Sequence, residues 1–270
     1  MSDAAFESLS TPIRQDRTTF VWQVPQGWQQ GRGVFGGLVL AALVRAMEEA
    51  VAGETPLPLR TITATLCGAT VPGEATIEIE FLRLGSNTTT IAAKLIQEGE
   101  LRTHIVGLFG KDRGVGELGD WKTLQAPELP WHEEIPIAPM KPPLAPMFTQ
   151  FMNFQPTSHF PFTGGDELKS LGWVRVKNPG EDRGAPYIAA HADAWWPTML
   201  ATLDSFRPLA TVTFTLELFE DFDMENLDAP MIHRAEAVAS RGGYFAEFRE
   251  LWGADGRLLA LNQQTFCVIK

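Results

Sequence analysis

One carboxylate stands inside an apolar segment of the chain, and its immediate surroundings do not explain it. Asp193 lies in AHADAWWPTML, residues 190–200, where only His191 and Thr198 add polar groups. An ionised carboxylate is costly to bury without hydrogen-bonding partners. A carboxylate that has partners and also meets water is suited to act as a general base. The first question is therefore which side chains pair with Asp193.

Uncharged polar side chains on two predicted strands are the candidate partners. By alternation, three threonines of ATVTFTLELF (residues 210–219) share one face: Thr211, Thr213 and Thr215. In ALNQQTFC, Gln264 and Gln263 face opposite sides. A carboxylate, a hydroxyl and a carboxamide can together hold and polarise one water molecule, with Asp193 as the base. The residues alone leave a plain alternative open, because threonine is common in strands and aspartate often caps a helix.

A glycine-rich stretch precedes the first predicted helix. GRGVFG matches G-x-G-x-x-G at Gly31, Gly33 and Gly36. A dinucleotide-binding fold is disfavoured, because that motif also needs a strand ending at its first glycine and a parallel strand after the helix. The backbone N–H groups of Gly36 and Gly37 can instead receive an anion or a developing oxyanion. Close packing of the helix is the alternative.

Other catalytic and metal-binding motifs do not occur in the sequence. There is no G-x-S-x-G, no H-E-x-x-H and no paired C-x-x-C, and the five histidines are scattered. No metal and no cofactor are therefore expected. Cys67 and Cys267 lie in apolar runs and are predicted to be reduced thiols in the core.

The composition narrows the class of protein. The 270 residues are 44% hydrophobic and 20% charged, as in a globular protein, and the net charge is −11. This charge argues against nucleic acid and anionic membranes as partners. No apolar run reaches the roughly 20 residues of a membrane span, and the N-terminus lacks a secretory signal. A cytoplasmic protein is expected.

The order of predicted elements repeats along the chain. A strand at 20–25, a helix at 38–51 and strands at 59–71, 75–85, 88–99 and 101–110 precede a proline-rich linker. After it come strand-like segments at 147–156 and 172–178, a helix at 187–203 and strands at 209–220, 231–240, 244–253 and 258–269. This repetition indicates an internal duplication. It predicts an α+β fold with two antiparallel sheets, each wrapped around one long helix. The predicted units are a half at 18–110, a linker at 111–147 and a half at 148–270.

The chain resembles the acyl-CoA thioesterase II (TesB-type) family, whose fold is a double hotdog. The segments that carry the resemblance are GVFGG at the first helix, AHAD in the second, LATVTFTLELF after it and DGRLLALNQQ near the carboxyl end. Together they cover about residues 18–270, the linker being least comparable. The family often continues its threonine strand with a D-H-S/T-type segment, where this chain has Thr213–Phe214–Thr215.

The resemblance implies hydrolysis of an acyl-CoA thioester by direct attack of water, without a covalent intermediate. It places the base at Asp193 and the water-orienting hydroxyl and amide at Thr211 and Gln264, with Gln263 as the neighbouring alternative. It also implies that the backbone at Gly36 and Gly37 binds the oxyanion.

The phosphates of CoA need cations, for which Arg32, Arg60 and Lys111 are candidates. The first-half counterparts of the acid, hydroxyl and amide are predicted at Gly36/Gly37, Thr61 and Gly107, so that only the second half carries the site.

Alternative functions remain open at this point. A non-catalytic acyl-CoA or lipid-binding protein and an assembly scaffold fit the same fold. A hydratase is disfavoured, because no histidine follows Asp193 within five residues. Pairing of sheet edges predicts a homo-oligomer.

Overall fold

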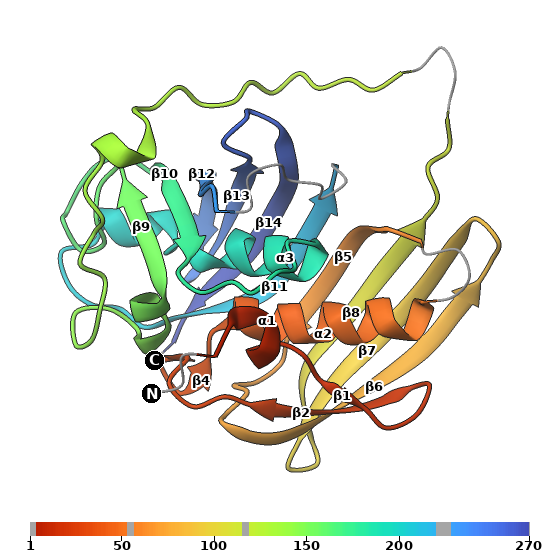
Figure 1. Ribbon diagram of the computed structural model, residues 1–270. Helices are drawn as coiled ribbons and strands as arrows, with labels where there is room; N and C mark the ends of the chain where they lie inside the picture. Colours follow the sequence, from red (N-terminus) through yellow and green to blue (C-terminus); the bar gives the residue numbers. More distant parts are fainter. Residues whose placement is uncertain (1–3, 53–56, 115–118, 220–227, 270) are drawn as a thin grey trace.

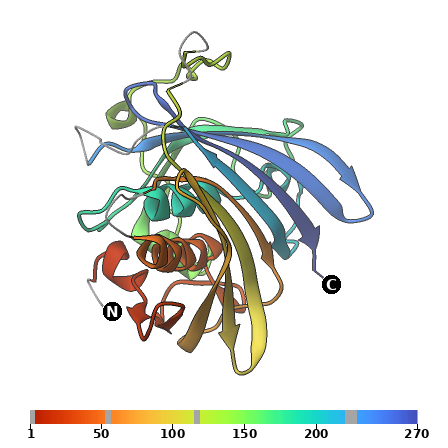
Figure 2. The ribbon, with the colours of Figure 1, turned by 90° about the vertical axis from the view of Figure 1, so that its right-hand side faces the viewer.

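Two helices lie side by side on one face of a long antiparallel sheet. The computed structural model describes residues 4–52, 57–114, 119–219 and 228–269. Among these, the helices α2 (Gly36–Val51) and α3 (Ala185–Ala194) contact each other. Figure 1 shows them in front of the strands, and in Figure 2 the strands of both halves curve around the helices.

The sheet has twelve strands in its described part. The first half supplies, in spatial order, β1 (Ile13–Arg14), β2 (Thr19–Val24), β6 (Gly73–Leu84), β7 (Thr88–Gln97), β8 (Glu100–Gly110) and β5 (Leu59–Leu66). The second half continues with β11 (Leu209–Leu218), β14 (Leu258–Val268), β13 (Tyr244–Trp252), β12 (Met231–Arg241), β10 (Lys169–Val176) and β9 (Met152–Pro156). A separate hairpin contains β3 (Gln29–Gln30) and β4 (Gly33–Val34), and α1 (Phe6–Leu9) precedes the first strand.

The prediction of two separate sheets is wrong. Strand β5 pairs with β11, with Thr63 opposite Thr215, so the two halves form one continuous sheet. The physical reason is that each half alone would leave the edge of a long strand unpaired, and each strand satisfies the other's backbone groups. The mostly antiparallel pairing itself agrees with the prediction.

Alternation explains why the strands form where the sequence predicts them. In β6, Ala75, Ile77 and Ile79 are buried, whereas Glu78 and Glu80 between and after them are exposed. One face therefore packs on α2 and the other meets solvent. The other predicted hairpin strands also lie close to their predicted bounds. Residue 220, the predicted end of β11, lies outside the described residues.

Strand β5 ends earlier than predicted, at Leu66. The backbone N–H groups of Cys67 and Gly68 both donate to the carbonyl of Arg102, at 2.8 and 3.0 Å, and this turns the chain out of the ladder. Cys67 is consequently exposed, and Cys267 lies half-buried on the outer face of β14. Both are free thiols, but the prediction that they lie in the core is wrong.

The second helix is shorter than predicted. It begins at Ala185 and ends at Ala194, and Trp195 is already extended (φ −78°, ψ 147°). Pro197 contributes to this early end, because it lacks the N–H that would bond the carbonyl of Asp193 and it disfavours a helical conformation of Trp196. A short 3-10 turn, η4 (Thr198–Thr202), follows. The first helix agrees with the prediction and begins two residues earlier, at the glycine pair.

The proline-rich linker crosses the outside of the second half. Leu124, Leu129 and Ile135 pack against a small apolar cluster that includes Trp173 and Trp252. Within the linker, η2 (His132–Glu134) is a single 3-10 turn, and η3 (Met147–Phe151) leads into β9. Figure 1 shows the linker passing over the strands of the second half.

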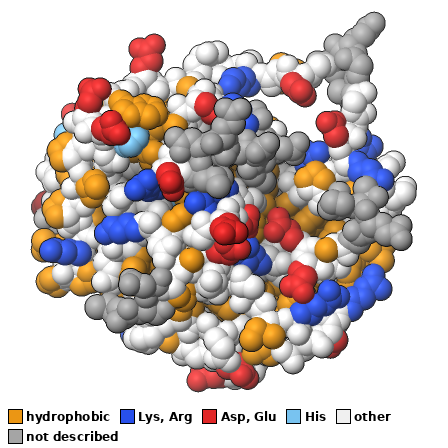
Figure 3. Space-filling view, in the orientation of Figure 1, with side chains coloured by type: hydrophobic (Ala, Val, Ile, Leu, Met, Phe, Trp, Pro, Cys, Tyr) orange, Lys and Arg blue, Asp and Glu red, His pale blue; other side chains and the backbone are white. Residues whose placement is uncertain are grey.

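Two further features concern the charges on the surface and the apolar character of the helices. On the face in Figure 3, basic and acidic side chains are interspersed rather than segregated. No helix in the described part of the chain has the length and apolar character needed to cross a bilayer.

Candidate active site

Asp193 lies in the last turn of α3, against the first turn of α2. A Cβ atom on Gly36 would lie 2.7 Å from Oδ2 of Asp193, and one on Gly37 would lie 2.7 Å from the carbonyl oxygen of Ala190. Both distances are shorter than a carbon–oxygen contact allows, so the two glycines permit the helices to approach. The start of α2 also presents the positive end of its dipole to the carboxylate.

Gly36 and Gly37 are therefore neighbours of Asp193 and not its counterparts. The prediction that they occupy its equivalent position in the first half is wrong, because they open α2 whereas Asp193 lies near the end of α3.

Thr211 and Gln264 lie beside Asp193 on adjacent strands. The hydroxyl of Thr211 donates to Oε1 of Gln264 at 3.3 Å. The amide nitrogen of Gln264 donates to Oδ1 of Asn262 at 2.9 Å and to the carbonyl of Ala192 at 3.4 Å. Gln264 is completely buried, and its orientation is fixed by these bonds. The structure thus brings the predicted acid, hydroxyl and amide together.

A β-bulge at Val212 decides which threonine faces this site. Thr211 lies opposite Phe266 on the inner face, but Thr213 lies opposite Thr265 on the outer face, because the register shifts between them. The prediction that Thr211, Thr213 and Thr215 share one face is therefore wrong. An extra residue in a strand turns the following side chains over, and bulges are common beside active sites.

The same device occurs in the first half. A register shift lies between Leu59 and Thr61 in β5, so the counterpart of Thr211 is Leu59 and the predicted Thr61 is wrong. Gly107 lies opposite Ile62 just as Gln264 lies opposite Phe214, which agrees with the predicted counterpart of the amide.

The neighbouring glutamine points away from the site. Gln263 lies opposite Thr215 on the outer face and is exposed. Of the two adjacent glutamines, only Gln264 is placed to contact Asp193.

The surroundings of Asp193 raise its pKa toward neutral pH. Burial raises the pKa of Asp193 from 3.8 to about 6. The charge of Arg249, a hydrogen bond with the Gln264 side chain and one from the backbone N–H of Gly37 each lower this pKa in part. Taken over the whole residue, Asp193 is of intermediate exposure. A base with a pKa of about 6 is ionised at neutral pH and is strong enough to take a proton from water in a transition state.

Two charged residues beneath the site were not predicted from the sequence. Glu247 and Arg249 are buried on the inner face of β13, where the burial pattern of YFAEFRELW alternates. The missed signal is that both share the face of Phe245 and Leu251, which the apolar pattern assigns to the interior.

The two arginines proposed for substrate binding lie in different places. Arg32 is exposed at the turn between β3 and β4, four residues before Gly36. Arg60 lies at the opposite end of β5 from Leu66, which contacts the Gly36 position. Leu66 is six positions farther along the strand than Arg60, or about 20 Å. Arg60 also donates to the carbonyl of Gly110 at 2.9 Å. The structure does not bring Arg60 to Asp193.

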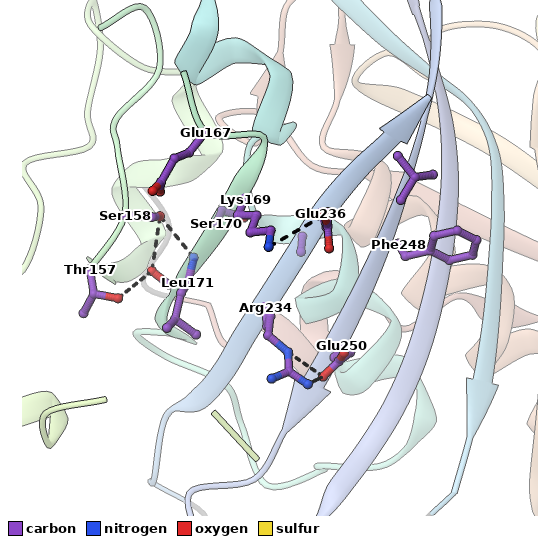
Figure 4. A pocket seen from close by; sticks show the side chains of 12 residues that line it. Thr157, Ser158, Glu167, Lys169, Ser170, Leu171, Arg234, Glu236, Phe248 and Glu250 are labelled. Carbon is purple, nitrogen blue, oxygen red and sulfur yellow. Dashed lines mark hydrogen bonds and ion pairs between the residues drawn. The ribbon is translucent and has the colours of Figure 1, made fainter. Parts of the chain in front are cut away.

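A separate hollow of about 540 Å³ lies on the outer face of the second half. Residues of β10, β12 and β13 and of the segment before β10 line it, and Figure 4 shows two ion pairs there: Lys169 with Glu236 and Arg234 with Glu250. It does not contain Asp193. Among the described residues, no group of three or more His, Cys, Asp or Glu side chains is arranged to hold a metal ion.

Two family models together match most of the chain. Residues 24–110 match the acyl-CoA thioesterase N-terminal domain, and residues 125–268 match the acyl-CoA thioesterase C-terminal domain. No curated protein sequence gives a significant match.

Solved structures share the fold across the whole chain. A conserved protein of unknown function with a hot dog fold from Alicyclobacillus acidocaldarius is 23% identical, with a TM-score of 0.85 and coverage of 100% of this chain and 99% of that one. A putative thioesterase II from Thermobifida fusca is 20% identical, with a TM-score of 0.81 and full coverage of both chains. The acyl-CoA thioesterase II TesB2 from Mycobacterium marinum is 14% identical, with a TM-score of 0.77 and 98% coverage of each.

The fold and the paired domains define a thioesterase with a hotdog fold. The chain belongs to the acyl-CoA thioesterase family and is a thioester hydrolase.

Proposed function

We propose that the chain hydrolyses acyl-CoA thioesters by direct attack of a water molecule that Asp193 activates. Asp193 takes a proton from the water as the water oxygen bonds to the thioester carbonyl carbon. Thr211 and Gln264 orient that water. The tetrahedral intermediate then breaks its carbon–sulfur bond, and the departing thiolate accepts the proton, giving a free acid and CoA.

One observation carries this proposal. The bulge at Val212 turns Thr211 to the inner face, where its hydroxyl meets Gln264, and the amide of Gln264 in turn contacts the helix turn that holds Asp193. Gln264 thus links the hydroxyl of Thr211 to the carboxylate of Asp193, whose pKa is raised to about 6. This combination supports water activation better than it supports simple capping of a helix.

The first turn of α2 is the proposed oxyanion site. The backbone N–H of Gly37 hydrogen-bonds Asp193 and so fixes the base. The N–H of Gly36, in the same turn, is the donor that we assign to the oxyanion, assisted by the helix dipole. Arg32, at the nearby exposed turn, is the cation that we assign to the CoA phosphates.

The test is release of free CoA thiol from short, medium, long and aromatic acyl-CoAs. Asp193→Asn should lower kcat/KM by roughly a thousandfold on the best substrate, as expected for loss of a general base. Gln264→Ala should also lower activity, whereas Gln263→Ala, its outward neighbour, should not.

Two results would count against the proposal. Full activity of Asp193→Asn would assign the base elsewhere. An inactive wild type that still binds acyl-CoA saturably would identify a binding protein built on the same fold.

A further inference from the structure

A buried ion pair lies beneath the candidate site and takes no part in the proposed reaction. Nε of Arg249 lies 2.8 Å from Oε1 of Glu247, and their side chains are 1% and 0% exposed. Removing two charges from water is costly, and replacing such a pair with apolar residues is often neutral or stabilising. Stability alone therefore gives a poor account of this pair.

The ion pair holds the chain on both sides of Asp193. Nη1 of Arg249 donates to the carbonyl of Ala192 at 3.0 Å, directly before the carboxylate residue. Oε2 of Glu247 accepts both the backbone N–H and the hydroxyl of Thr198, each at 2.7 Å. Helix α3 ends between these two points, at Ala194, so helical hydrogen bonds do not fix the segment that follows.

We propose that the Glu247–Arg249 ion pair is a positioning device for Asp193, which holds the chain on either side of the carboxylate and supplies the charge that keeps it ready to accept a proton. This inference rests on the proposed function, because it takes Asp193 as the base. Neither residue contacts the reacting atoms in this scheme; both act through Asp193.

Among the described residues, two buried histidines lie near Asp193, and the charge of Arg183 acts on one of them, His191. His191, on α3 itself, has its pKa lowered to about 4 by burial, and His233 on β12 has its pKa lowered well below 6.5 by burial and by Arg249. The site residues on β11 and β14 carry no charge, and the first turn of α2 has no acidic residue. Arg249 is the charge that acts on Asp193, and Glu247 is the ion-pair partner of Arg249.

Because Arg249 and Glu247 carry opposite charges, their removal should shift the pH dependence of kcat/KM in opposite directions. The acid limb of kcat/KM against pH reports the base of the free enzyme. Arg249→Met should move this limb upward by about half a pH unit or more, and Glu247→Gln should move it downward by about the same amount. A merely structural role predicts lower activity without opposite shifts.

A conservative variant distinguishes the effect of the positive charge of Arg249 from the effect of its hydrogen bonds. Arg249→Lys keeps the positive charge but cannot bond Glu247 and Ala192 together in the planar arrangement of the guanidinium. It should leave the acid limb within about 0.3 pH unit of wild type and lower kcat by roughly tenfold. The double variant Arg249→Met/Glu247→Gln leaves no unpaired buried charge, so it serves where a single variant does not fold. Its limb should lie between those of the two single variants.

The outer face of the same strands offers a matched control. Arg234 and Glu250 form an ion pair on β12 and β13 with side chains that face the outer hollow (Figure 4). Arg234→Met and Glu250→Gln should leave the limb unchanged.

Shifts of the limb in the same direction for both inner variants, or no shift in either, would overturn the inference. Failure of the proposed function is seen separately, as activity that survives Asp193→Asn.

Discussion

The inner faces of the two halves share one backbone plan and differ in their side chains. Each half carries a bulge in the strand at the junction, between Leu59 and Thr61 in one and between Thr211 and Thr213 in the other. The two bulges give a common starting point for aligning the strand registers of the two halves. In this alignment, six polar residues of the second half correspond to apolar or small residues of the first. The pairs are Thr211 with Leu59, Gln264 with Gly107, Glu247 with Ile91, Arg249 with Ala93, Asn262 with Ile105, and His233 with Ile77.

This difference shows that one fold serves two purposes in one chain. At these six positions the first half has apolar or small residues, and a Cβ atom at Gly107 would lie 2.5 Å from Met47. The second half buries charges and amides, which lowers stability unless every group finds a partner. Its polar interior is therefore best explained by the site that it supports.

The largest expected effect comes from placing a polar group in the wrong half. Ile105 is completely buried, so Ile105→Asn introduces an amide where the first half offers an apolar interior. It should lower the free energy of unfolding by about 3 kcal/mol, measured by urea unfolding. The reciprocal variant, Asn262→Ile, should lose less stability and more activity. Equal losses of stability from the two would break the comparison.

A second effect concerns the pH dependence of stability. The pKa of Asp193 is raised to about 6 in the folded chain from 3.8, so the unfolded chain releases its proton first. Stability therefore falls as the pH rises from about 4 to about 6. Asp193→Asn should be more stable than wild type by about 3 kcal/mol at pH 7, and this gain should vanish near pH 3.5. Thermal unfolding at both values checks it; a variant less stable than wild type at pH 7 would contradict the role of burial.

The smallest effect tests the bulge itself. Thr211→Val removes the inward hydroxyl and should lower kcat/KM by about tenfold, or 1.4 kcal/mol. Thr213→Val changes the same group two residues away on the outer face and should change kcat/KM by less than about twofold. Similar losses from both variants would mean that the bulge does not select the hydroxyl.

The alternation of apolar and polar residues, together with the turn residues, was enough to predict the hairpin strands. Successive side chains of a strand point to opposite faces, and one of these faces is buried. The pattern did not reveal where that period breaks. The bulge at Val212 follows from pairing with β14, a long-range contact, and the sequence around it shows plain alternation. The early end of α3 had a local signal in Pro197, which the apolar run around it obscured.

The candidate site was predicted in part. Asp193, Thr211 and Gln264 were named in advance, and the structure places them together. The close approach of Gly36 to the acid was not foreseen, because it depends on how two helices pack. Arg60 illustrates the converse, since a basic residue in the sequence carries no information on its distance from a site.

The glycine at the start of α2 also shows how the two halves differ at the candidate site. The second half's own helix starts with Ala185 and Pro186, so a symmetric pair of second halves would bring a methyl group toward each aspartate where Gly36 has none. Aspartate and glycine in this arrangement must come from halves that have diverged. The candidate site is therefore a composite one, to which α2 of the first half contributes the glycine and α3 of the second half the aspartate.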